Sequence, residues 1–330
     1  MIKSKILYQC LALASFIVVM HTSYAATPTI KVGVLKYGTV NWEMDVIKNR
    51  QIDDSFGINI EVIPYASKQA TLVAFQSGAV DVIVADWIWV SIQRHNEKNY
   101  TFIPYSTALG EVMVPAQSDI TSLTTLQNKQ LGVAGGPLDK SWLMLQTLSK
   151  AKFGFDMSTQ LTAQYAAPPL LNGQLENKQI DAVLNFWHYC ARLEAKGYRS
   201  IHSIRSTVNQ LLGYKIQLPM LGYVFRTPDN QMMTEQYQKF SQISQTAHHI
   251  MLNNDQEWQR LKPLMKVKDE NTFMVLRDRY REGIPQKWGN YERAGANIIY
   301  NIIAKAGGHQ LVGDHPQLAT GTFWPYVSYE

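Results

Sequence analysis

The chain has 330 residues, of which 46% are hydrophobic and 17% are charged. This length exceeds that of a typical single domain, so two lobes are expected. The formal net charge of +5 is small for the length and the Lys and Arg residues are scattered, which argues against a protein that binds nucleic acid or an anionic membrane.

The first 25 residues have the layout of a secretory signal peptide. Lys3 and Lys5 precede an almost wholly apolar run, Ile6–Met20, and Ser23-Tyr24-Ala25 offers small residues for cleavage before Ala26. The apolar run is shorter than the ~20 residues that span a bilayer. We therefore expect export to the periplasm and cleavage near Ala25.

Cysteine usage fits a chain that is stabilised by its core alone. Cys10 lies in the expected signal peptide, so the mature chain keeps one cysteine, Cys190, and forms no internal disulfide. Cys190 lies at a predicted helix start, where we expect a small buried apolar residue rather than a reactive thiol.

Strand patterns and helix patterns alternate along the first two thirds of the chain. The first series has strands at 30–35, 58–64 and 80–85 and helices at 42–50, 68–77 and 87–96. The second series has strands at 130–134, 161–165 and 180–185 and helices at 141–150, 170–177 and 187–196. Such alternation predicts βαβ units, mostly parallel sheets and an α/β fold.

The second series repeats the first. Four residue types recur at a separation of 100 residues, in the pairs Trp42 and Trp142, Tyr65 and Tyr165, Asp81 and Asp181, and Trp87 and Trp187. A glycine recurs within the first strand of each series, as Gly33 and Gly132. The repeat is too long for a solenoid unit and predicts two βαβαβ lobes of one design. We expect Asp81 and Asp181 to be structural residues at strand entries.

Two extended stretches, 106–116 and 219–226, flank the second series and are expected to cross between the lobes. These crossings place residues 26–112 and 222–330 in the first lobe and residues 113–221 in the second. From Pro228 to about Gly307 the pattern is mainly helical, and these C-terminal helices are assigned to the first lobe. The aromatic tail is expected to pack along the outside of a lobe.

The chain resembles the periplasmic substrate-binding proteins of ABC transporters in the nitrate, sulfonate and taurine group. The residues that carry the resemblance are 30–34, the helix and strand at 72–82, and 132–137. The resemblance covers about residues 30–226. It implies a type II periplasmic binding protein fold with a ligand cleft between the lobes, and delivery of the ligand to an ABC permease and ATPase in the inner membrane.

In open α/β sheets, ligands bind outside the carboxyl ends of the strands. Aromatic and polar residues gather at the predicted strand ends of both lobes, which places the cleft there. The candidate ligand contacts are Tyr37, Asn41, Trp42, Tyr65, Ser67, Asp86, Trp87, Gly136, Asp139, Lys140, Trp142, Tyr165, Asn185, Trp187 and His188.

The charged residues at these strand ends favour two different kinds of ligand. Gly135-Gly136 followed by a helix start and Lys140 favours a carboxylate, sulfonate or nitrate. Asp86 and Asp139 favour a cationic or amine-bearing ligand, and the aromatic residues favour a flat ring or a cation. We therefore expect a small organic ligand of the sulfonate, zwitterionic amine or pyrimidine-like type.

Three alternatives stay open at this point. A metal-binding protein would use Asp86, Asp139 and His188, a sensor would signal to a membrane receptor, and an enzyme would use the carboxylate pair Asp86 and Asp139. The chain has neither a Gly-x-Ser-x-Gly nor a His-Glu-x-x-His motif. We therefore expect a monomeric binding protein without a cofactor or a catalytic role.

Overall fold

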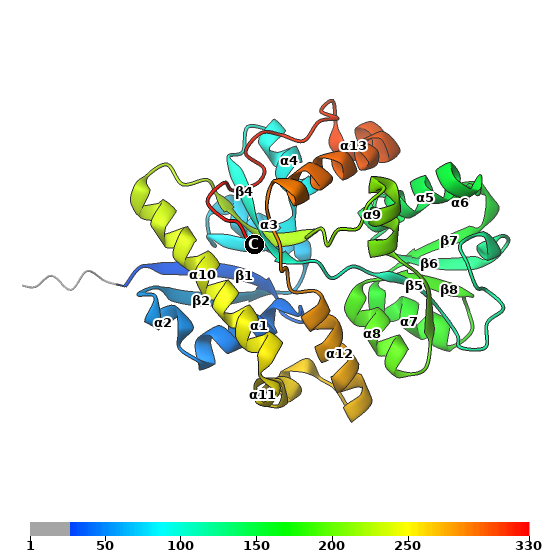
Figure 1. The fold of residues 1–330 in the computed structure, drawn as a ribbon, viewed down its shortest axis with the longest axis horizontal. Helices are drawn as coiled ribbons and strands as arrows, with labels where there is room; N and C mark the ends of the chain where they lie inside the picture. Colours follow the sequence, from blue (N-terminus) through cyan, green and yellow to red (C-terminus); the bar gives the residue numbers. More distant parts are fainter. Residues whose placement is uncertain (1–26, 330) are drawn as a thin grey trace, which may run out of the picture.

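The structure is a computed structural model that describes residues 27–329. Two five-stranded sheets lie side by side, each flanked by helices (Figure 1). We call the parts built around these sheets the first and the second lobe. The expected signal peptide lies outside the described residues. Among residues 27–329, no helix combines the length and apolar character needed to cross a bilayer.

The first lobe contains a mixed sheet with the strand order β2-β1-β3-β10-β4. Its parallel strands are β1 (Thr29–Leu35), β2 (Asn59–Tyr65) and β3 (Val82–Asp86). Strand β10 (Leu221–Arg226) runs antiparallel between β3 and β4 (Tyr100–Ser106). The predicted alternation in this half is confirmed, and β4 is an additional strand.

The second lobe repeats this topology in the order β7-β6-β8-β5-β9. Strands β6 (Gln130–Ala134), β7 (Thr162–Ala166) and β8 (Ala182–Asn185) are parallel. Strand β5 (Glu111–Val114) runs antiparallel between β8 and β9 (Arg199–Ser203). Each sheet thus receives its fourth strand, β10 or β5, from a segment where the chain crosses between the lobes.

The helices follow the predicted pattern, with α2, α6 and α9 as additions. Those of the first lobe are α1 (Val40–Asn49), α2 (Ile52–Ser55), α3 (Lys68–Ser77) and α4 (Trp87–His95). Those of the second lobe are α5 (Lys140–Phe153), α6 (Met157–Gln160), α7 (Pro168–Glu176), α8 (Trp187–Ala195) and α9 (Ile204–Leu212). The C-terminal helices are α10 (Gln231–Asn253), α11 (Asp255–Met265), α12 (Glu270–Glu282) and α13 (Asn290–Val312).

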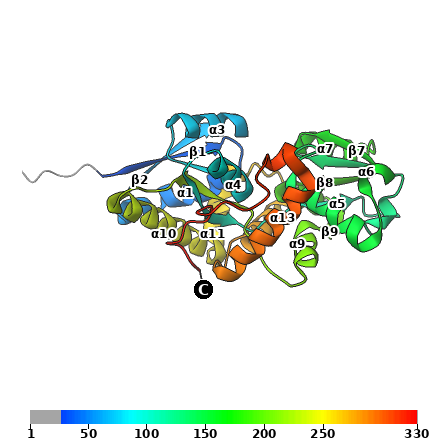
Figure 2. The ribbon, with the colours of Figure 1, turned by 90° about the horizontal axis from the view of Figure 1, so that it is seen from above.

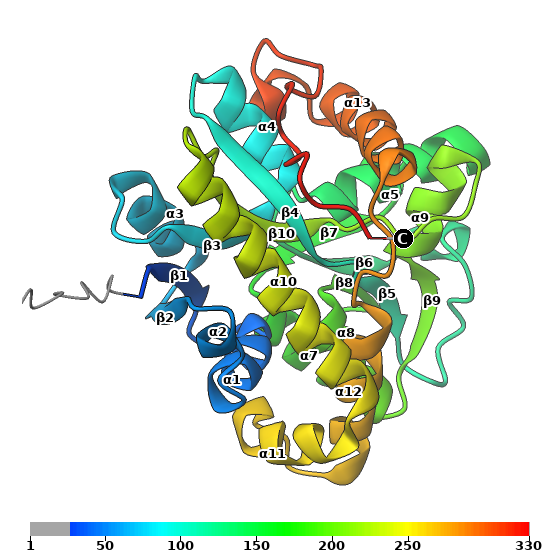
Figure 3. The same cartoon turned by 60° about the vertical axis from the view of Figure 1, so that its left-hand side comes forward.

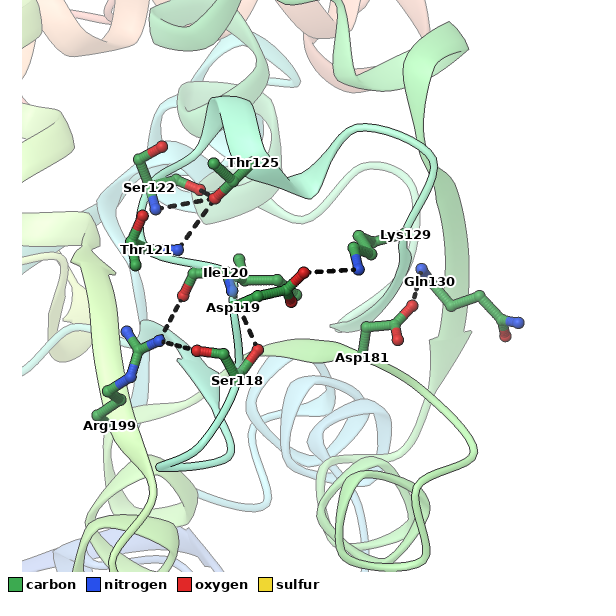
Figure 4. A network of polar contacts seen from close by, with 10 residues as sticks. All are labelled: Ser118, Asp119, Ile120, Thr121, Ser122, Thr125, Lys129, Gln130, Asp181 and Arg199. Carbon is green, nitrogen blue, oxygen red and sulfur yellow. Dashed lines mark hydrogen bonds and ion pairs between the residues drawn. The ribbon is translucent and has the colours of Figure 1, made fainter.

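The repeated aspartates make the same hydrogen bond in both lobes. The Asp81 carboxylate accepts the Lys31 backbone N–H at 2.8 Å. The Asp181 carboxylate accepts the Gln130 backbone N–H at 2.7 Å (Figure 4). Each bond joins the entry of the third parallel strand to the first strand of its lobe, as expected for structural strand-entry residues.

The repeated glycines also have one physical cause. A Cβ on Gly33 would lie 3.1 Å from Val80 Cγ2, and a Cβ on Gly132 would lie 2.7 Å from Ile180 Cδ1. The side chain that precedes the third parallel strand therefore packs directly onto the backbone of the first strand. This close approach explains the glycine in each repeat.

A polar network anchors the loop between β5 and β6 (Figure 4). The Arg199 guanidinium donates to the carbonyls of Ser118 and Ile120, at 2.7 Å each. The Thr125 hydroxyl accepts the backbone N–H groups of Thr121 and Ser122. Because this network lies beside the amino ends of β6 and β8, at the end of the sheet away from the candidate contacts, its role is structural.

The C-terminal helices, which the sequence pattern assigned to the first lobe, also contact the second lobe. Helix α12 packs against α8 (Figure 3), and α13 packs against α5 and α9 (Figures 2 and 3). The Arg279 guanidinium of α12 lies 2.8 Å from a carboxylate oxygen of Glu194 on α8 and 3.3 Å from one of Glu111 on β5, a strand of the second sheet. The sequence pattern identified these helices but carried no information about their partners.

The aromatic tail is part of the first lobe's core rather than an outer covering. Trp324 donates its backbone N–H to the Phe102 carbonyl at 3.0 Å, so the tail pairs with the edge strand β4. The Trp324 side chain is 1% exposed. The tail therefore covers a sheet edge that would otherwise present unpaired backbone groups.

Candidate ligand-binding site

The two lobes meet at the carboxyl ends of their parallel strands. Asp86 is the last residue of β3, and Lys140 is the first residue of α5, in the connection that follows β6. The Lys140 ammonium nitrogen lies 3.4 Å from Asp86 Oδ2. Side chains predicted from separate repeats are thus brought together at the place where an α/β sheet binds ligands.

Asp86 is the most highly coordinated side chain at this junction. Its Oδ1 accepts the Trp89 backbone N–H at 2.8 Å and so caps α4. Its Oδ2 lies 3.4 Å from the ammonium groups of both Lys68 and Lys140. The Asp86 side chain is 9% exposed, so these partners act in a partly desolvated environment.

The charge state of this cluster follows from its neighbours. Burial disfavours the charged form of Asp86, but Lys140, Lys68 and the Trp89 N–H outweigh burial and hold its pKa well below the usual range. Asp86, as the strongest influence, raises the pKa of Lys140. Both groups are therefore ionised at neutral pH.

The turn that precedes Lys140 requires glycine. Gly135 and Gly136 have φ values of +89° and +92°, in the left-handed region. Asp139 caps α5 by accepting the backbone N–H groups of Ser141 and Trp142 at 2.9 and 3.2 Å. Burial raises the pKa of the Asp139 carboxyl, against these hydrogen bonds and Lys140. The turn and the cap therefore fix the position from which the Lys140 side chain extends toward Asp86.

An aromatic cluster also joins the lobes. The Trp42 ring of α1 meets the Trp187 ring of α8 edge-on, with centroids 6.3 Å apart. Trp42 also contacts Trp258 at 6.0 Å and Tyr280 at 5.6 Å. Trp42 is 5% exposed, whereas Trp187 is only partly buried. Trp187 is therefore the member of the cluster with surface left for a ligand.

His188, next to Trp187, is largely neutral at neutral pH. Burial and the nearby Arg192 lower its pKa to about 4. Its Nδ1 atom is buried and has no hydrogen-bond partner among the described residues. An unpaired buried polar atom is costly, so a hydrogen-bonding group that reached this nitrogen would stabilise it.

Two predicted contacts are core residues in this conformation. Trp87 is fully buried and donates its indole N–H to the Pro219 carbonyl at 2.9 Å. Trp142 is 1% exposed. Neither ring presents surface to a ligand, and Trp42, at 5% exposure, presents little. The proposed site therefore omits all three tryptophans.

Two predicted asparagines have backbone roles. The Asn185 amide is 1% exposed, donates to the Pro168 carbonyl at 2.9 Å and to Asn172 Oδ1 at 2.8 Å, and thus ties β8 to α7. The Asn41 amide donates to the carbonyls of Leu35 and Gly38, both at 2.7 Å, and holds the turn after β1. Their hydrogen-bonding capacity is used within the chain.

The remaining predicted contacts lie at strand ends with accessible surface. Tyr37 and Tyr165 are 71% and 45% exposed, and Tyr65 is partly buried. Ser67 caps α3 by accepting the Ala70 N–H. The Lys266 ammonium lies 4.2 Å from the centroid of the Tyr37 ring. Tyr37, Tyr65, Ser67 and Tyr165 therefore stay candidate contacts.

Sequence reasoning missed three residues of the junction. Lys68 directly follows Ser67, and its position at a helix start was the available signal. Trp258 and Tyr280 belong to α11 and α12, outside the repeats, so no strand-end pattern pointed to them. Within residues 27–329, no group of three His, Cys, Asp or Glu residues is placed to hold a metal ion, and Asp86, Asp139 and His188 form no such group.

No family model matches the chain, and no curated protein sequence matches it. Solved structures do match. The alkanesulfonate-binding protein SsuA from Xanthomonas axonopodis pv. citri, bound to MOPS, superposes with a TM-score of 0.66 at 15% identity, over 91% of this chain and 99% of that one. The aliphatic sulphonate binding protein SsuA from Escherichia coli gives 0.69 at 14% identity, over 90% and 97%.

The fold is that of the periplasmic sulfonate-binding proteins. An ABC transporter protein from Parabacteroides distasonis shares it, with a TM-score of 0.68 at 11% identity over 89% of this chain and 98% of that one. The predicted type II, two-lobed binding-protein fold is confirmed. At these identities the likeness concerns the fold, and the ligand has to be argued from the side chains of this chain.

Proposed function

We propose that this chain is an exported periplasmic solute-binding protein that captures a small organic ligand by closure of its two lobes. It delivers the ligand, as a monomer, to an ABC permease and ATPase in the inner membrane. The closing units are residues 26–112 with 222–330 and residues 113–221, and α12 and α13 touch both. The fold and the layout of residues 1–25 support this proposal.

One observation carries the proposal. Asp86 of the first lobe and Lys140 of the second lobe meet at the strand ends, at 3.4 Å. A ligand placed there touches both lobes at once, so its binding energy favours the closed arrangement. If only one lobe reached this position, a ligand bound there would not stabilise the closed arrangement.

The side chains at the junction favour an organic anion or zwitterion. Lys68 and Lys140 share one carboxylate oxygen of Asp86, which leaves ammonium N–H groups free to bind a sulfonate or carboxylate. Trp187 and His188 add a flat apolar surface and an unpaired nitrogen. The proposed contacts are Tyr37, Tyr65, Ser67, Gly136, Asp139, Lys140, Tyr165, Trp187 and His188, and Asp86 lies beside them as the partner of Lys140.

An enzymatic role for Asp86 and Asp139 is less well supported. Their pKa values move in opposite directions, as in many acid–base pairs. However, each carboxylate caps a helix, and the second oxygen of Asp86 is shared by two lysines. Carboxylates engaged in this way are poorly placed to exchange protons with a substrate, and binding remains the favoured function.

A thermal-shift screen tests the proposal. The panel contains alkanesulfonates including MOPS, amines, zwitterionic amines and pyrimidines, and mass spectrometry identifies any ligand that co-purifies. A ligand that binds only the folded protein raises the melting temperature. The expected result is a concentration-dependent rise with at least one class. No rise with any class, or turnover of a compound by the purified protein, would contradict the proposal.

A further inference from the structure

The acid at the end of β3 has no counterpart in the second lobe. Asp86 precedes α4 as its cap, whereas the residue 100 positions later, Phe186, precedes α8 without a side-chain hydrogen bond. Helix α8 forms nevertheless, so a carboxylate is not needed to start a helix at this position of the repeat. Helix capping alone therefore does not explain why the residue at position 86 is an aspartate.

The second oxygen of Asp86 provides that explanation. Oδ2 is shared by Lys68 of the first lobe and Lys140 of the second lobe, each at 3.4 Å. Of these two contacts of Oδ2, the one with Lys140 joins the lobes and the one with Lys68 lies within the first lobe. The side chains of Asp86 and Lys140 are 9% and 26% exposed, so water and salt screen this pair less than a surface pair.

We propose that Asp86 is a built-in counter-ion that holds Lys140, and with it the second lobe, in the ligand-free protein. The inference rests on the proposed function, because it concerns closure at the same site. An anionic ligand that enters the cleft competes with the Asp86 carboxylate for the Lys140 ammonium. Asp86 thereby sets the minimum affinity that an anion must supply and discriminates against weakly bound anions.

Linkage fixes the sign of the effect. If the ligand takes Lys140, the Asp86–Lys140 pair stabilises only the ligand-free state. Neutralising Asp86 then destabilises that state, leaves the ligand-bound state unchanged and tightens the binding of an anion. A carboxylate that contacts a cationic group of the ligand has the opposite effect, because its neutralisation weakens binding.

Asp86→Asn is the decisive variant because asparagine can still accept the Trp89 N–H and cap α4. Small-angle X-ray scattering of the ligand-free protein is expected to show a larger radius of gyration for Asp86→Asn and for Lys140→Met than for the wild type. Lys68→Met is the matched control for this readout, because Lys68 binds the same oxygen at the same distance from within the first lobe. Its radius of gyration is expected to equal that of the wild type.

Titration with MOPS and with inorganic sulfate gives the second arm. For a probe that the wild type binds, Asp86→Asn is expected to bind about tenfold more tightly. An unchanged radius of gyration in both Asp86→Asn and Lys140→Met, or weaker probe binding by Asp86→Asn, overturns the counter-ion role. The scattering needs no ligand, so it decides this inference even if no compound binds, an outcome that would count against the proposed function instead.

Discussion

Cys190 lies in the core of the second lobe, with its sulfur 3.2 Å from the Asn185 carbonyl oxygen. Burial raises the pKa of the Cys190 thiol to about 12, so almost no thiolate exists at neutral pH. We predict that folded protein lacking residues 1–25 reacts with a disulfide reagent far more slowly than the same protein in denaturant. Colorimetric thiol titration measures both rates, and a native rate close to the denatured rate would contradict this burial.

His188 makes stability depend on pH. An unfolded histidine binds its proton near 6.5, whereas folded His188 binds one only near 4. Between these values the unfolded state holds more protons, so the stability contribution is complete above pH 6.5 and is lost as the pH falls toward 4. The expected loss is about 3 kcal/mol in the free energy of unfolding.

Urea unfolding at several pH values checks the His188 effect. His188→Gln is expected to flatten the pH dependence over this window. His309→Gln, whose side chain is 78% exposed, is the control and should retain the wild-type slope. Equal slopes for wild type and His188→Gln would show that His188 titrates as in water.

The turn between β6 and α5 permits a matched comparison of two glycines. A Cβ at Gly135 would lie 2.6 Å from Asp139 Oδ2, whereas a Cβ at Gly136 meets nothing within 4 Å. Both replacements strain a left-handed backbone by about 1 kcal/mol. Gly135→Ala must also displace the cap of α5, which adds about 1 kcal/mol. Denaturant unfolding should rank Gly135→Ala below Gly136→Ala in stability, and equal stabilities would argue against the cap contact.

The repeated aspartates predict equivalent costs in the two lobes. Asp81→Ala and Asp181→Ala each remove one hydrogen bond that joins two strands. The two bonds have similar lengths, 2.8 and 2.7 Å. Each is expected to lower the free energy of unfolding by about 1 kcal/mol. Asp119→Ala is the control, because that side chain is 81% exposed. A cost in one lobe and none in the other would contradict the structural equivalence of the repeats.

At the scale of the molecule, hydrophobic periodicity predicted most strands and helices because burial repeats with the period of each element. The strands that escaped prediction lack that signal. β4 is interrupted by Pro104, and β9 is largely polar. Their places in the sheets come from tertiary pairing with β10 and β5.

The candidate site was predictable only in part. Position at a strand end identified Asp86 and Lys140, whose meeting depends on both lobes having the same design. It did not separate Trp87 and Trp142, which are core, from Trp187, which keeps accessible surface. That distinction depends on how the lobes and the C-terminal helices pack, and no local pattern encodes it.

Binding that depends on Lys140 tests the account most directly. Isothermal titration of the compound with the largest thermal shift compares the wild type with Lys140→Met and Lys150→Met. Lys150 lies on the same helix, but its side chain is 71% exposed and pairs with Asp156. We predict that Lys140→Met weakens binding at least about tenfold, since it loses a charged contact, and that Lys150→Met binds as the wild type does. Equal affinity of Lys140→Met and the wild type would contradict capture of the ligand between the lobes.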